Sequence, residues 1–120
     1  NRYLAGITEV ALKDYVADKT NWRTMLKNEI KDENLVEWRE RLKQYIPDEA
    51  KDFFIESNTE TNLEFPVHRY PGKPKSLNLV KEQSYSGKLV GIKGQYLIFE
   101  DDTVFNIRGN EGLVVAISVK

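Results

Sequence analysis

Basic side chains and one tyrosine share a single stretch of the chain, in a segment rich in glycine and proline and in the apolar run that follows it. They are Arg69, Tyr70, Lys73, Lys75, Lys88 and Lys93. Cations contact phosphates, and an aromatic ring can stack on a base. The sequence therefore predicts a nucleic-acid-binding surface formed by these residues, with DNA or RNA as the partner.

The same lysines also have a purely structural interpretation. Edge strands often carry lysine because the charge prevents unwanted strand pairing, and this would explain Lys88 and Lys93 without a ligand. The chain has 18 basic and 19 acidic residues, a net charge of −1, so it has no general attraction to nucleic acid or membrane. No apolar run is long enough to span a bilayer, and we expect no membrane partner.

Few residues suit catalysis. His68 is the only histidine and there is no cysteine, so a nucleophile paired with a base has no support, and we expect His68 to be an exposed loop residue. The acidic run Glu100 to Asp102 lacks the regular ligand spacing of a calcium loop and is expected to be a solvated turn. We expect no enzymatic activity from this segment.

Trp22 and Arg23 permit two interpretations. They could stack on a base and contact a phosphate. Alternatively, Trp22 belongs to a buried helix stripe with Met25 and Ile30, and Arg23 pairs with a nearby acid. The second interpretation is the simpler one.

The first half of the chain has the apolar period of helices. Residues 4–16, 20–30 and 35–46 each show apolar side chains at steps of three and four, and residues 48–56 add a shorter stretch. Asp32, Glu33 and Asn34 supply a capping side chain and negative charge for the start of the third helix, and Pro47 ends that helix or opens the next. We therefore expect three to four amphipathic helices within residues 1–56.

The second half has the pattern of short strands. A polar connector and edge segment, residues 57–75, leads to residues 76–120, where strands are expected at 88–92, 95–100, 103–108 and 113–119. Turns at Lys93-Gly94 and Asp101-Asp102 should join them. With short strands near 63–67 and 77–79, this predicts an antiparallel meander or small barrel. The expected class is α+β, with one shared core or two.

Several separated motifs resemble one known family. They are Thr20-Asn21-Trp22-Arg23, Lys75-Ser76-Leu77, residues 91–99 and Phe105-Asn106-Ile107-Arg108. Together they are similar to the C-terminal part of an uncharacterised bacterial family known only as a domain of unknown function. The resemblance implies an upstream cysteine-rich segment that looks zinc-binding and a middle part similar to the GIY-YIG nuclease fold.

The resemblance also bears on metals. Asn1 in place of Met suggests that the chain is part of something longer. In GIY-YIG proteins a helix after the small sheet carries a metal-binding Glu, and Glu9 would lie about there. A lone Glu can hold Mg²⁺ only with other ligands, and its alternative role is a solvent-facing helix residue. We expect no cofactor in this segment, although Mg or Zn could belong to the full-length protein.

Two functions from different classes follow. The first is a noncatalytic C-terminal module of a cytoplasmic protein, which assists nucleic-acid binding by a nuclease-like half. The second is a structural or protein-interaction domain with no nucleic-acid role.

Overall fold

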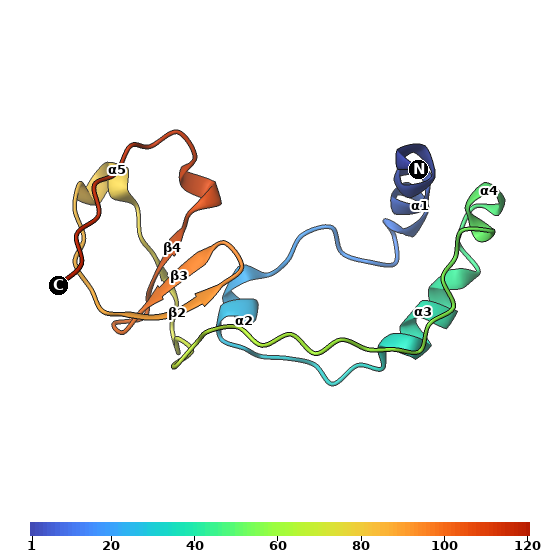
Figure 1. Cartoon of the computed structure of the whole chain (residues 1–120), viewed down its shortest axis with the longest axis horizontal. Coiled ribbons are helices and arrows are strands. Elements are labelled where there is room, and N and C mark those ends of the chain that lie inside the picture. Colours follow the sequence, from blue (N-terminus) through green and yellow to red (C-terminus); the bar gives the residue numbers. More distant parts are fainter. The chain divides into compact units, whose positions relative to one another are not determined.

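A computed structural model describes residues 1–120 and divides them into two compact units. The helical unit contains residues 1–21 and 30–62, and the sheet unit contains residues 22–29 and 63–120. The chain has five α-helices and one four-stranded mixed sheet, so the predicted α+β class is confirmed. Figure 1 shows the helices and the sheet. None of the helices has the length and apolar composition needed to cross a bilayer.

Three helices form the helical unit: α1 (Arg2–Leu12), α3 (Leu35–Lys43) and α4 (Asp48–Lys51). Asn34 caps α3, since its Oδ1 accepts a hydrogen bond from the backbone N–H of Glu37 at 3.1 Å, and it belongs to the run that was predicted to supply the cap. Pro47 directly precedes α4, where its missing N–H costs nothing. Ala50 is the one buried apolar residue of this unit.

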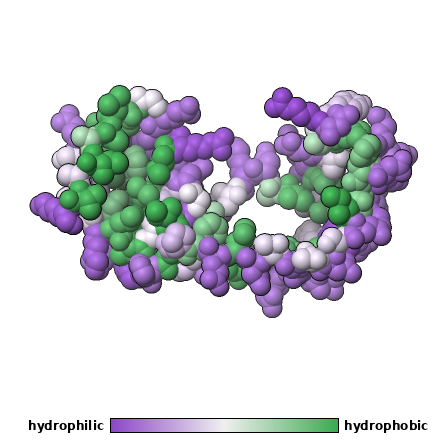
Figure 2. All heavy atoms as spheres, in the orientation of Figure 1, coloured by the Kyte–Doolittle hydropathy of each residue, from purple (hydrophilic) through white to green (hydrophobic).

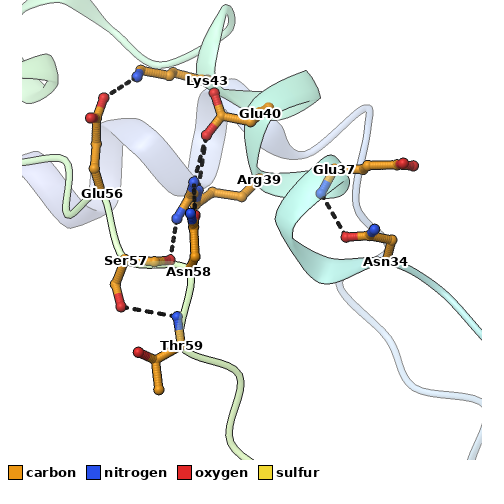
Figure 3. A network of polar contacts seen from close by, with 9 residues as sticks. All are labelled: Asn34, Glu37, Arg39, Glu40, Lys43, Glu56, Ser57, Asn58 and Thr59. Carbon is orange, nitrogen blue, oxygen red and sulfur yellow. Dashed lines mark hydrogen bonds and ion pairs between the residues drawn. The ribbon is translucent and has the colours of Figure 1, made fainter.

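Arg39 on α3 forms hydrogen bonds with the polar segment that follows α4, at Ser57 and Asn58, as Figure 3 shows. Its guanidinium donates to the Ser57 carbonyl and, at 3.1 Å, to Asn58 Oδ1. Glu40 holds the same guanidinium at 2.7 Å, and Lys43 forms an ion pair with Glu56. Arg39, Glu40 and Lys43 on α3 are thus paired within the unit, without a ligand.

The sheet has the order β1-β4-β3-β2. Its strands are β1 (Lys75–Ser76), β2 (Leu89–Lys93), β3 (Tyr96–Phe99) and β4 (Thr103–Asn106). The β2–β3 and β3–β4 pairs are antiparallel, and β1 lies parallel to β4. Gly94 and Asp102 take positive φ angles of 57° and 68° in the connecting turns, so the predicted turns are confirmed.

Helix α2 (Trp22–Leu26) packs against this sheet. Leu26 is fully buried in a cluster with Val90, Tyr96, Ile98 and Val104, and Trp22 and Met25 pack against the same cluster. A helix of five residues is unstable alone, so packing of its apolar stripe on the sheet must hold it. The core of the sheet unit thus depends on a helix that lies far upstream in the sequence.

The predicted fourth strand at 113–119 and the closed barrel are wrong. No strand forms at 113–119, and the sheet is open and mixed. After β4, a 3₁₀ turn (Arg108–Asn110) redirects the chain, held by bonds from Gly109 N to Asn106 Oδ1 at 2.9 Å and from Asn110 Nδ2 to Asn106 O at 2.7 Å. The edge of β4 that does not face β3 is paired with β1, so it is not open to residues 113–119.

The two shorter predicted strands are also corrected. Around Leu77 the strand is limited to β1, because Asn78 Oδ1 accepts from Val80 N and Lys81 N and starts helix α5 (Leu79–Glu82). At 63–67 a single bridge joins Val67 to Gly91. The Pro66 carbonyl accepts from Ile92 N at 3.0 Å, so this segment runs along the β2 edge, where proline is tolerated.

Candidate nucleic-acid-binding surface

Asp102 attaches the basic segment 69–75 to the sheet. Its carboxylate accepts from Arg69 Nη2 at 3.1 Å and from the Lys73 backbone N–H at 3.0 Å. Its own carbonyl accepts from Lys75 N at 2.9 Å, which begins the pairing of β1 with β4. The acidic turn predicted to be solvated is therefore the anchor of the basic segment.

The same turn neutralises part of the predicted surface. The Arg69 guanidinium also donates to the Glu100 carbonyl, and Lys88 Nζ lies 3.2 Å from Glu100 Oε1. The Lys88 pair is exposed, and such pairs contribute little to stability. Lys73 and Lys75 are exposed and form no ion pair, so they are the cations of this segment that remain available to a ligand.

Asp101 stabilises the turn. Its Oδ1 accepts from Thr103 N at 3.0 Å and from the Tyr85 hydroxyl at 2.8 Å. The Thr103 backbone bond, followed by the Tyr85 bond, lowers the pKa of the Asp101 carboxyl. Burial raises the pKa of Tyr85, whose ring packs edge-on against Phe99. These contacts give Asp101 a role in shaping the loop.

Lys93 lies inside the sheet unit and is 7% exposed. Its ammonium donates to the Met25 carbonyl at 2.9 Å and to Asn28 Oδ1 at 3.0 Å, at the C-terminal end of α2. The centroids of the Phe65 and Tyr70 rings lie 5.3 and 5.1 Å from the same nitrogen, within range of cation–π attraction. The ammonium is thus enclosed by two oxygens and two aromatic rings.

No carboxylate balances this charge. Burial therefore lowers the pKa of the Lys93 ammonium from its ordinary value. Helix C-termini favour cations, so the Met25 carbonyl offsets part of the desolvation. Lys93 joins α2 to the sheet, and its side chain is not presented to solvent. Tyr70 is half-buried, and its ring faces this ammonium.

The chain was compared with known families, curated proteins and solved structures. The family model described as "Protein of unknown function (DUF2797)" matches residues 1–115. The chain belongs to this family. The searches of curated proteins and of solved structures found no match.

In this DUF2797 chain, the two remaining residues considered for a site, His68 and Glu9, belong to different units. His68 is exposed, and its backbone N–H donates to the Val90 carbonyl at 2.8 Å. Glu9 is exposed on α1, and no three acidic or histidine side chains come together as a metal site. One carboxylate does not make a metal centre, so Glu9 would need further ligands to hold a divalent cation.

Trp22 and Arg23 combine features of both interpretations. Trp22 and Met25 pack against the core, as the simpler one predicts, whereas Ile30 lies beyond α2 and is exposed. The centroid of the Trp22 ring lies 6.0 Å from that of Tyr96, with an interplanar angle of 14°. Arg23 pairs with no acid. Its Cζ lies 4.2 Å from the centroid of the Trp22 ring. A tryptophan followed by an arginine at the start of a short amphipathic stretch was the available signal, but the contact with Tyr96 was not visible in the sequence.

Proposed function

We propose that this DUF2797 chain is a noncatalytic module that assists nucleic-acid binding by a nuclease-like part of a longer protein. The observation that supports the proposal is that Lys73 and Lys75 have a fixed backbone and exposed, unpaired side chains. Asp102 holds the backbone of both residues on the sheet, while their ammonium groups remain exposed and unpaired. Fixed backbone and free cations suit contact with phosphates, which positions a nucleic acid without reading its sequence.

The test is the salt dependence of binding. Purified chain is titrated into short fluorescently labelled DNA or RNA, and affinity is followed by anisotropy from about 50 to about 200 mM salt. We expect affinity to fall steeply. Replacing Lys73 and Lys75 with Glu should abolish detectable binding, because two phosphate contacts become repulsive.

A matched control separates this surface from net charge. Lys13 and Lys19 are exposed residues of the helical unit, and replacing both with Glu changes the net charge equally. We expect the control to bind as the parent does. Absence of binding by the parent at low salt, or equal losses in both double variants, would contradict the proposal.

The alternative, a protein-interaction domain with no nucleic-acid role, is favoured by a different observation. The C-terminal segment 113–119 is apolar and fully on the surface, with Val114, Ile117 and Val119 almost entirely exposed. Figure 2 shows apolar side chains gathered over the sheet unit. Large exposed apolar patches mark interaction sites. A chain that binds no nucleic acid and associates with another protein through this segment would support the alternative.

A further inference from the structure

Arg23 is the sheet unit's exposed guanidinium that rests on an aromatic ring and has no acidic partner. The Trp22 ring beneath it is supported in turn by Tyr96, which is buried in the core. Arg23 therefore contacts Trp22 and Trp22 contacts Tyr96, whose position is fixed by core packing. A stacked arginine keeps its outer face and edge donors available to a ligand.

Several other cations of the sheet unit are already paired or buried. Arg69 is held by Asp102, Lys27 by Glu29 at 2.5 Å, and Lys93 is buried. An unpaired, pre-positioned guanidinium costs little entropy to order when a ligand arrives. Base stacking on aromatic side chains or guanidinium planes is how unpaired nucleotides are bound.

We propose that the outer face of Arg23 binds an unpaired nucleobase, which makes single-stranded nucleic acid the preferred ligand. The proposal rests on the proposed function and specifies its ligand. Lys73 and Lys75 contact phosphates, which a duplex and a single strand both offer. Arg23 contacts a base face, which a duplex keeps inside its stack.

Another arginine of the chain provides a matched control. Arg41 Cζ lies 5.4 Å from the centroid of the Trp38 ring, and Arg41 is also exposed. There, however, the Trp38 indole donates to Glu33 Oε2 at 2.7 Å, so a carboxylate lies at the ring. A negative group at this position opposes nucleic-acid binding, and Arg41 should make no contribution.

The experiment compares a short single strand and its duplex by anisotropy, for the parent, Arg23→Gln, Arg23→Lys and Arg41→Gln. We expect Arg23→Gln and Arg23→Lys each to weaken single-strand binding about tenfold, because lysine keeps the charge but lacks the planar group. Duplex binding should change less than about twofold, and Arg41→Gln should match the parent. Thermal unfolding of each variant checks that the fold is intact.

The outcomes separate the two proposals. Full single-strand affinity in Arg23→Lys would show a phosphate contact and overturn the base-stacking inference, and parent-like binding by Arg23→Gln would overturn it too. Equal losses in Arg41→Gln would also overturn it. In those cases the proposed function stands if Lys73 and Lys75 are still required. If the parent binds neither probe, the proposed function fails and this inference fails with it.

Discussion

Replacing Lys93 with Met tests whether the buried ammonium holds α2 on the sheet. Methionine keeps the apolar stem and removes the charge, so the Met25 carbonyl and Asn28 Oδ1 lose their donor. Hydrogen bonds from a charged group contribute about 1.5–3 kcal/mol each. Removing a buried charge that has no carboxylate partner relieves a desolvation cost and offsets part of this loss. We expect the free energy of unfolding to fall by about 1–3 kcal/mol.

Urea unfolding measures this change. Trp22 lies in the sheet unit and Trp38 in the helical unit, so Trp22 fluorescence in a Trp38→Phe background reports the sheet unit alone. With a denaturant slope of about 1–2 kcal/mol/M, a loss of ~2 kcal/mol lowers the urea midpoint by about 1–2 M.

The pH dependence gives a second signature. Burial lowers the pKa of Lys93 in the folded state, so the unfolded chain binds this proton more tightly. The corresponding stability is present above the ordinary value of 10.5 and is lost as pH falls through the folded pKa. The parent should therefore gain stability relative to Lys93→Met as pH rises toward 10.5.

Lys88→Met is the control, since Lys88 directly precedes β2 and its side chain is 73% exposed. Its loss should change stability by no more than about 0.5 kcal/mol, with no added pH dependence. If Lys93→Met unfolds at the parent midpoint and follows the parent pH profile, Lys93 does not anchor α2 on the sheet.

Two further predictions concern the acidic turn. Asp102→Asn keeps an acceptor for Lys73 N and tolerates the positive φ, but it removes the ion pair with Arg69 and leaves that cation without an acidic partner. Plots of log affinity against log salt should become steeper by about 0.7 for a single strand, and an unchanged slope would show that Arg69 gains no phosphate contact. In Asp101→Asn the carboxyl with the lowered pKa is absent. That carboxyl's contribution is present above 3.8 and lost as pH falls through the folded pKa, so thermal midpoints recorded from about pH 5 to about pH 2 should fall less steeply in the variant than in the parent. Parallel profiles would contradict this.

The parts of the fold that follow from local chemistry were predictable. Gly94 tolerates the left-handed backbone that a tight hairpin requires, and Asp102 tolerates it in the next turn. Asn34 caps α3 by accepting a hydrogen bond from the backbone N–H of Glu37, three residues further along the chain. Each of these features involves residues close together in the sequence, so residue type and spacing were sufficient.

The pairing partner of β4 was not predictable in the same way. Residues 113–119 have the alternation and β-branched composition of a strand, whereas β1 has two residues and little pattern. Pairing depends on which segment reaches the free edge. The bond from Lys75 N to Asp102 O and the turn held by Asn106 decide it, and neither is visible as a sequence pattern.

The sequence also did not show which cations of the candidate site are available to a ligand. Lysines at 88 and 93 look equivalent in sequence, yet one is exposed and the other is enclosed by groups that come from α2 and from Phe65 and Tyr70. Arg69 meets its acid 33 residues away. A basic run therefore overstates the charge available to a ligand, because distant residues neutralise or bury part of it. The same long-range packing makes Arg23 a stronger candidate, because the Trp22 ring that it contacts packs against Tyr96 on the sheet. We therefore expect binding through Lys73, Lys75 and Arg23 and not through the whole run.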